Sequence, residues 1–163
     1  MPRAARGDGR RPEAVGDLLR STLAGRALKP RDYQDLPLWR QLTGAFVAGP
    51  VQHTGGPVIV PMTVLSPTYA EEIFTCLRQA GRFHHFVLHA EPAAFHERIE
   101  ASCECPGDPE RGEAVRAYRR CRAADYQEAA VSWLHAQGHV IDTTALTADQ
   151  TLQAALAHLH TAT

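Results

Sequence analysis

Apolar residues recur three or four positions apart in several stretches of the chain. Residues 12–25 carry such a stripe behind Pro12, which predicts an amphipathic helix that Gly25 ends. A second stripe predicts a helix from about Leu36 to Ala48, ahead of the Gly49-Pro50 pair. The positions that form the two stripes are Val15, Leu18, Leu19, Leu23, Leu38, Leu42 and Phe46.

Two short apolar runs have the character of strands. Residues 57–63 (PVIVPMT) show no polar alternation, which predicts a strand buried on both faces, and residues 83–89 (FHHFVLH) predict another. Between them Ser66-Pro67 is typical of a helix start, and Gly81 of a helix end. This order predicts parallel strands joined by a right-handed crossover, in an α/β layer fold.

The second half of the chain alternates polar and apolar segments. After Glu91-Pro92 we expect a helix, then an exposed Pro- and Gly-containing flap over residues 102–113, and then an arginine-rich helix over residues 113–137 that breaks near Asp125. Residues 138–142 (GHVID) predict a third strand. Thr147 and Gln150 have the spacing of a capping box for a last helix.

Composition narrows the class of protein. The 163 residues are 44% hydrophobic and 21% charged with a net charge of −1, values that fit one globular domain and argue against a nucleic-acid coat. No run of about 18 apolar residues is present, so no membrane partner is expected. Residues 1–11 predict a flexible basic arm without a secretory signal, and four cysteines fit reduced thiols in the cytoplasm.

Several kinds of active site are disfavoured. Lys29 is the only lysine among 17 basic residues and stands before Pro30, so the chain contains no G-x-x-x-x-G-K-[ST] phosphate loop. The neighbouring His84 and His85 point to opposite faces of a strand, and Cys103-x-Cys105 lacks zinc-knuckle spacing. We therefore expect no metal site, and no G-x-S-x-G nucleophile elbow is present.

Arginines gather on and after the flap. Guanidinium groups bind phosphate oxygens in a bidentate manner, so this density suits a lid that closes over phosphates. A solvated helix face paired with Glu113, Asp125 and Glu128 explains the same pattern equally well, and the sequence leaves both open. The arginines are Arg98, Arg111, Arg116, Arg119, Arg120 and Arg122.

Three segments resemble the tunicamycin-resistance proteins, a group of P-loop, nucleotide-kinase-like ATP-binding proteins. They are residues 12–20 (PEAVGDLLR), residues 32–40 (DYQDLPLWR) and residues 60–63 (VPMT), and the order of the later helices and strands is similar. The likeness runs from about residue 12 to the C-terminus, and residues 33–40 are its most specific part.

The resemblance implies a three-layer parallel sheet of the P-loop nucleotide-kinase type, here lacking the first strand and the P-loop. Residues 12–163 would then form an incomplete kinase-like domain with a lid around residues 102–122. By position in the family pattern, the substrate side would carry Asp35, Trp39, Arg40 and Thr63. The lid would supply Arg116, Arg119 and Arg122 as catalytic groups, and the nucleotide would meet Arg98, Asp142, Thr143 and Leu146.

The functional expectation follows from this resemblance. It implies phosphoryl transfer to a small molecule, or ATP-dependent handling of it, with ATP and magnesium as cofactors. Without a phosphate loop the 163-residue chain is expected to be inactive. The alternative is a non-catalytic α/β binding or dimerisation module that associates through exposed strand edges. A nucleic-acid partner is a weaker hypothesis, because the net charge is balanced.

Overall fold

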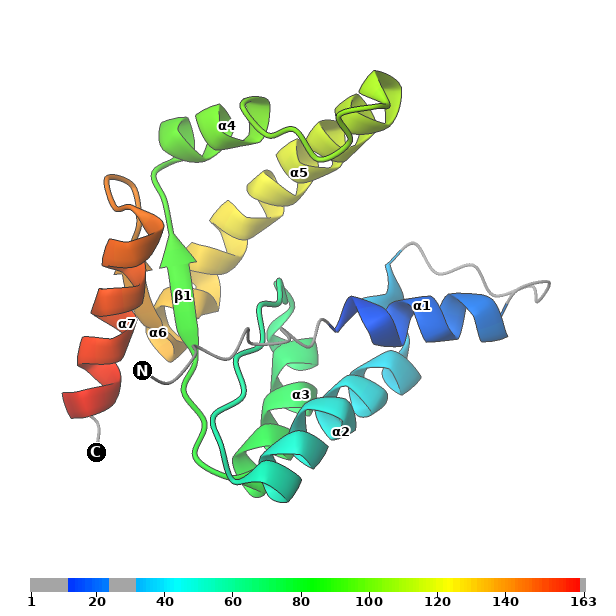
Figure 1. Ribbon diagram of the computed structural model, residues 1–163, viewed down its shortest axis with the longest axis vertical. Coiled ribbons are helices and arrows are strands. Elements are labelled where there is room, and N and C mark those ends of the chain that lie inside the picture. Colours follow the sequence, from blue (N-terminus) through cyan, green and yellow to red (C-terminus); the bar gives the residue numbers. More distant parts are fainter. Residues whose placement is uncertain (1–11, 24–31, 162–163) are drawn as a thin grey trace, which may run out of the picture. The chain divides into compact units, whose positions relative to one another are not determined.

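The chain divides between Phe83 and His84 into two units, each with its own core (Figure 1). The computed structural model describes residues 12–23 and 32–161. The predicted arm over residues 1–11 and the helix end at Gly25 lie outside the described residues. None of the helices within the described ranges combines the length and the apolar character that crossing a bilayer requires.

The first unit is helical. It contains α1 (Glu13–Thr22), a 3-10 turn (Tyr33–Asp35), α2 (Pro37–Thr54) and α3 (Pro67–Ala80). Helix α1 starts after Pro12, as predicted, and α3 starts after Ser66, whose hydroxyl accepts a hydrogen bond from the amide of Tyr69. The core consists of Val15, Leu19, Trp39, Val47, Ala48, Val64, Ala70, Ile73 and Phe74.

Helix α2 is longer than the sequence predicts. It continues through Gly49 and Pro50 to Thr54 and ends at Gly55, whose φ of 64° lies in the left-handed region. The predicted end at Ala48 was therefore wrong. Packing against α3 extends along α2, and a Cβ added at Gly44 would lie only 3.1 Å from the Cβ of Cys76. Pro50 cannot donate the backbone hydrogen bond of a helical residue, yet α2 continues past it as one member of this close helix pair.

Residues 57–63 do not form the predicted strand. They have no regular secondary structure, and half-buried and exposed residues alternate along them, with Ile59 80% exposed. The prediction of burial on both faces was also wrong. A strand needs hydrogen bonds to a neighbouring strand, and the described residues of this unit contain no strand with which the segment could pair. The expected crossover from this segment to the next strand is therefore absent.

The second unit is built around two parallel strands, β1 (Phe86–His89) and β2 (His139–Asp142). They pair in register, with Phe86 opposite His139 and His89 opposite Asp142. Both strands were predicted, β1 with a later start. The described residues thus form a two-stranded sheet rather than the three-layer parallel sheet that the resemblance implied.

Helices connect and cover the strand pair. Helix α4 (Pro92–Glu100) follows β1, and α5 (Pro109–Ala129) returns the chain through a π-helical segment (Ala130–Leu134) and α6 (His135–Gln137) to β2. Helix α7 (Ala148–Thr161) packs beside β2 (Figure 1). The core of this unit contains Val87, Ala90, Ile99, Ala129, Ala130, Trp133, Leu134 and Ile141.

Helix α5 corrects two predictions. It begins at Pro109, inside the predicted flap, because the carboxylate of Asp108 accepts a hydrogen bond from the amide of Arg111 and so caps the helix. It also runs unbroken past Asp125, and the irregularity lies at Ala130–Leu134 instead. The buried side chains of Trp133 and Leu134 belong to this π-helical turn.

Candidate functional site at the ends of β1 and β2

The carboxyl ends of the two parallel strands place polar side chains together. His89 ends β1, Asp142 ends β2, and the two are opposite each other in the strand register. Ligands of open α/β sheets bind outside this edge, because the loops that follow the strands diverge there. The strand pair therefore carries its candidate site at this end.

His89 contacts α5, α6 and the residue that precedes α4. Its Nδ1 lies 2.8 Å from the hydroxyl of Tyr126 on α5, and its Nε2 lies 4.0 Å from Oε1 of Glu91. The ring also meets the ring of His135 edge-on, with the centroids 4.9 Å apart. Only 17% of the His89 side chain is exposed, and its imidazole lies between the phenol of Tyr126 and the carboxylate of Glu91.

The two acids of the site have opposite pKa shifts. The hydroxyl and the amide of Thr144 donate to Oδ1 of Asp142 at 2.6 and 2.9 Å, and these bonds lower the pKa of Asp142. Burial raises the pKa of Tyr126, and the negative charge of Asp142 raises it further. At neutral pH the site therefore holds a carboxylate and a protonated phenol, which together offer a hydrogen-bond acceptor and a donor.

Arg98 fixes the loop that follows β2. Its guanidinium donates to the hydroxyl of Thr143 at 3.1 Å, to the carbonyl of Thr143 at 2.6 Å and to the carbonyl of Thr144 at 3.2 Å. Thr143 in turn donates to the carbonyl of His89 at 2.7 Å, and the Leu146 amide donates to the carbonyl of Thr143 at 3.2 Å. The four residues predicted to meet a nucleotide thus occupy one loop and its anchor.

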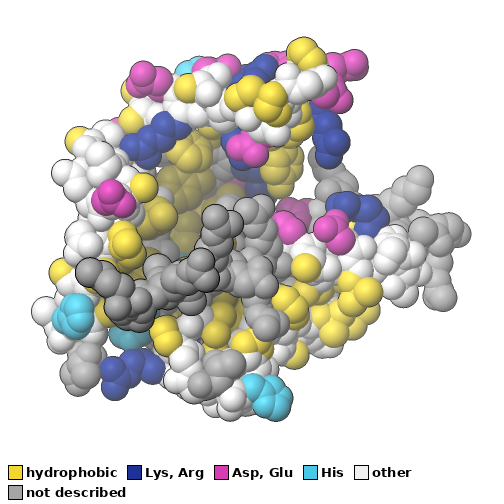
Figure 2. Space-filling view, viewed as in Figure 1, with side chains coloured by type: hydrophobic (Ala, Val, Ile, Leu, Met, Phe, Trp, Pro, Cys, Tyr) yellow, Lys and Arg dark blue, Asp and Glu magenta, His cyan; other side chains and the backbone are white. Residues whose placement is uncertain are grey.

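The predicted lid arginines are paired with carboxylates. Arg116 lies 2.9 Å from Glu113, Arg119 lies 2.8 Å from Glu104, and Arg122 lies 2.9 Å from Asp125. Figure 2 shows basic and acidic side chains mixed at the top of the view, where Figure 1 places α4 and the start of α5. Of the two interpretations that the sequence allowed, this arrangement resembles the solvated helix face paired with acidic residues.

The residues predicted for the substrate side lie together in the first unit. The guanidinium of Arg40, which is 6% exposed, binds both oxygens of Glu72 at 2.6 and 3.3 Å and the carbonyl of Gln34 at 2.5 Å. It also lies 4.2 Å from the ring centroid of Tyr69. Arg40 therefore joins the 3-10 turn to α2 and α3, with its Nε, Nη1 and Nη2 each donating within the unit.

Asp35 and Thr63 are the exposed members of this group. The Tyr69 hydroxyl donates to Asp35 at 3.2 Å, and the side-chain amide of Gln34 donates to the carbonyl of Thr63 at 2.7 Å. Trp39 is 5% exposed and packs near Gly16 and Tyr33. Tyr69 and Gln34 thus hold the two residues that solvent can reach, and Arg40 binds the backbone of Gln34.

Sequence reasoning missed His89, Tyr126 and Glu91. His89 had a usable signal, because it is the last residue of a predicted strand and precedes Glu91-Pro92. Tyr126 had none, since its place opposite His89 depends on a contact between residues 37 positions apart.

The arginines predicted to bind phosphates are each paired with a carboxylate. Within the described ranges no group of three or more His, Cys, Asp or Glu side chains is placed to hold a metal ion, and the motif G-x-x-x-x-G-K-[ST] does not occur in the sequence. Binding of ATP and magnesium therefore stays a prediction from the resemblance.

Comparisons with known proteins give a fold likeness. No protein-family model and no curated protein matches the sequence. Among solved structures, the tunicamycin resistance protein of Deinococcus radiodurans matches with a TM-score of 0.66 and 20% sequence identity, over 92% of this chain and 80% of that chain. This likeness covers most of the chain and shows a similar fold.

Proposed function

We propose that the chain is a tunicamycin-resistance-type, kinase-like protein that binds a small molecule, and that its 163 residues alone do not turn over ATP. The observation that carries the proposal is the fold likeness to the Deinococcus radiodurans protein, at a TM-score of 0.66 over 92% of the chain. The segments around residues 12–20 and 32–40 support it independently, because they resemble the same family in sequence.

Binding would use the exposed polar groups that each unit presents. In the first unit these are the carboxylate of Asp35, which accepts from the Tyr69 hydroxyl, and the side chain of Thr63, whose carbonyl accepts from Gln34. In the second unit they are Asp142 and the loop anchored by Arg98. ATP and magnesium would need a phosphate loop supplied from outside this sequence, because phosphoryl transfer depends on positioning and charge neutralisation.

The test is protection of a tunicamycin-sensitive bacterium, with growth measured across a range of tunicamycin concentrations. We expect the chain to raise the tolerated concentration, Asp35→Ala to reduce that protection, and the exposed Asp17→Ala in α1 to leave it unchanged. Purified chain should hydrolyse no magnesium-ATP above background. Absence of protection by well-expressed wild-type chain, or ATP turnover that a substitution within the 163 residues abolishes, would contradict the proposal.

The alternative, a dimerisation module, is favoured by exposed apolar side chains on β1 and on the segment 57–63. Leu88 on β1 is 59% exposed, and Ile59 in the segment 57–63 is 80% exposed. A strand with a free edge can accept a second copy of the chain. Size-exclusion chromatography of wild type and Leu88→Lys tests this, with the 89% exposed Val131→Lys as control. A wild-type monomer at all concentrations would rule the module out.

A further inference from the structure

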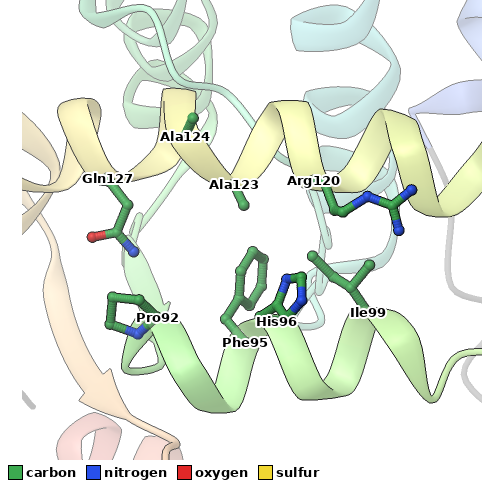
Figure 3. Close-up of a pocket in the computed structure, with 8 residues that line it drawn as sticks. All are labelled: Pro92, Phe95, His96, Ile99, Arg120, Ala123, Ala124 and Gln127. Atoms are coloured by element: carbon green, nitrogen blue, oxygen red, sulfur yellow. The ribbon is translucent and has the colours of Figure 1, made fainter.

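A hollow of about 210 Å³ lies between α4 and α5 in the second unit. Figure 3 shows the side chains that line it, which come from these two helices alone. None of the residues assigned above to the nucleotide or to the substrate lines it. The residues that line the hollow are Pro92, Phe95, His96, Ile99, Arg120, Ala123, Ala124 and Gln127.

The hollow exists because α5 presents two small residues where α4 presents large ones. Ala123 points toward Phe95, and Ala124 also lines the hollow, so the methyl groups of α5 leave space that longer side chains would fill (Figure 3). The ring of Phe95 also lies 6.1 Å from the ring of Tyr126, which extends the aromatic wall along α5. The floor of the hollow is therefore apolar and partly aromatic.

The rim of the hollow carries polar groups without a net positive charge. The guanidinium of Arg120 lies 2.8 Å from Glu100 and 2.5 Å from Glu113, so two carboxylates already balance it. His96 Nε2 lies 3.9 Å from Glu100. The Gln127 side chain contributes an amide, which both donates and accepts hydrogen bonds. Such a rim disfavours anions and suits a neutral ligand with a polar edge.

The size of the hollow limits the ligand further. An apolar cavity of about 150 Å³ is enough to hold benzene, so a volume near 210 Å³ suits one or two fused rings. Aromatic rings prefer offset or edge-to-face contact with another ring, and Phe95 offers such a partner.

We propose that the hollow between α4 and α5 is a binding site for a neutral, planar heteroaromatic molecule of one or two rings, which packs on Phe95 between the helices and forms a hydrogen bond with the amide of Gln127. Apolar walls with a few placed polar groups are the usual form of a small-molecule site. The site is independent of the function proposed above, since it uses none of the same residues.

The test uses indole as the probe, titrated into the full chain and followed by calorimetry and by saturation-transfer NMR. Ala124→Leu fills the hollow and should raise the Kd for indole about tenfold or more. Ala117→Leu is the matched control, because Ala117 is also an exposed alanine of α5 but does not line the hollow. Its affinity should equal that of the wild type.

A second variant separates binding from folding. Gln127→Leu replaces the amide with an apolar side chain of similar size, and it should weaken the binding of indole while leaving that of naphthalene, which has no polar edge, unchanged. This result decides the question if circular dichroism shows that Ala124→Leu is unfolded. No saturable binding of indole to wild type, equal binding to folded Ala124→Leu, or equal loss of both probes in Gln127→Leu would overturn the proposal.

Discussion

Arginines have different roles in the two units. In the first unit Arg40 is 6% exposed and joins three elements through Glu72, the Gln34 carbonyl and the Tyr69 ring. In the second unit Arg119, Arg120 and Arg122 lie on α5 with 26% to 39% of each side chain exposed, and each binds a nearby carboxylate. The same side chain therefore serves as an internal connector in one unit and as part of a surface network in the other.

From this difference we expect burial, and not the number of ion pairs, to set how much each arginine contributes to stability. Water and salt screen an exposed pair, so its contribution to stability is small. Removing one partner of a buried pair leaves the other groups without donors in a low-dielectric environment, which is costly. The stability of the second unit should therefore depend less on any one arginine of α5 than the stability of the first unit depends on Arg40.

The largest expected effect comes from Arg40. Arg40→Ala should lower the free energy of unfolding by about 1–3 kcal/mol, because the Gln34 carbonyl loses its donor and the Tyr69 ring its cation, whereas water can reach Glu72, whose side chain is 43% exposed. Urea denaturation followed by circular dichroism measures it. The control is Arg122→Ala on α5, whose unfolding midpoint should stay near that of the wild type. Similar midpoints for the two variants would show that burial does not distinguish the two units.

The space around one glycine in each unit can be compared by substituting alanine. A Cβ at Gly138 would lie 2.5 Å from Cγ2 of Val87 and 3.1 Å from the ring of His85, so Gly138→Ala should cost about 1–3 kcal/mol through overpacking. A Cβ at Gly16 in α1 would lie 3.6 Å or more from Trp39 and Tyr33, which is ordinary van der Waals contact, and Gly16→Ala should stabilise by up to about 1 kcal/mol, since alanine favours helices. Thermal melting compares them, and a raised midpoint for Gly138→Ala would contradict the packing argument.

The smallest expected effect concerns two exposed carboxyls. Hydrogen bonds from Arg120 and then Arg116 lower the pKa of Glu113, whereas the hydroxyl of Thr75 and then Arg78 lower the pKa of Glu71. Each therefore contributes stability that is present above its unfolded pKa and is lost as the pH falls through the lower folded pKa.

Carbon-13 NMR titration separates these two causes. Arg120→Ala should raise the pKa of Glu113, and Thr75→Val should raise that of Glu71. Added salt should move the pKa of Glu113 more, because screening acts on the charged guanidinium and not on a neutral hydroxyl. An equal response of the two carboxyls to salt would show that charge does not dominate at Glu113.

Local signals in the sequence predicted several elements well. Ser66-Pro67 starts α3, and Thr147 and Gln150 exchange the two hydrogen bonds of a capping box at the start of α7. These predictions were confirmed because each cap joins residues about three positions apart, within reach of any chain that begins a helix there. Asp108-Pro109 carried the same kind of signal for α5, but its place in a Pro- and Gly-containing stretch suggested a flap instead.

The sequence by itself determined where α1, α3 and α7 begin and where β1 and β2 lie, since these depend on neighbouring residues. Only the tertiary structure decided that residues 57–63 form no strand, that α2 passes Pro50, and that Tyr126 meets His89. Each of these depends on partners far along the chain. Strand pairing, helix packing and a buried imidazole all need a second surface, and a pattern of side chains cannot show whether that surface is in place.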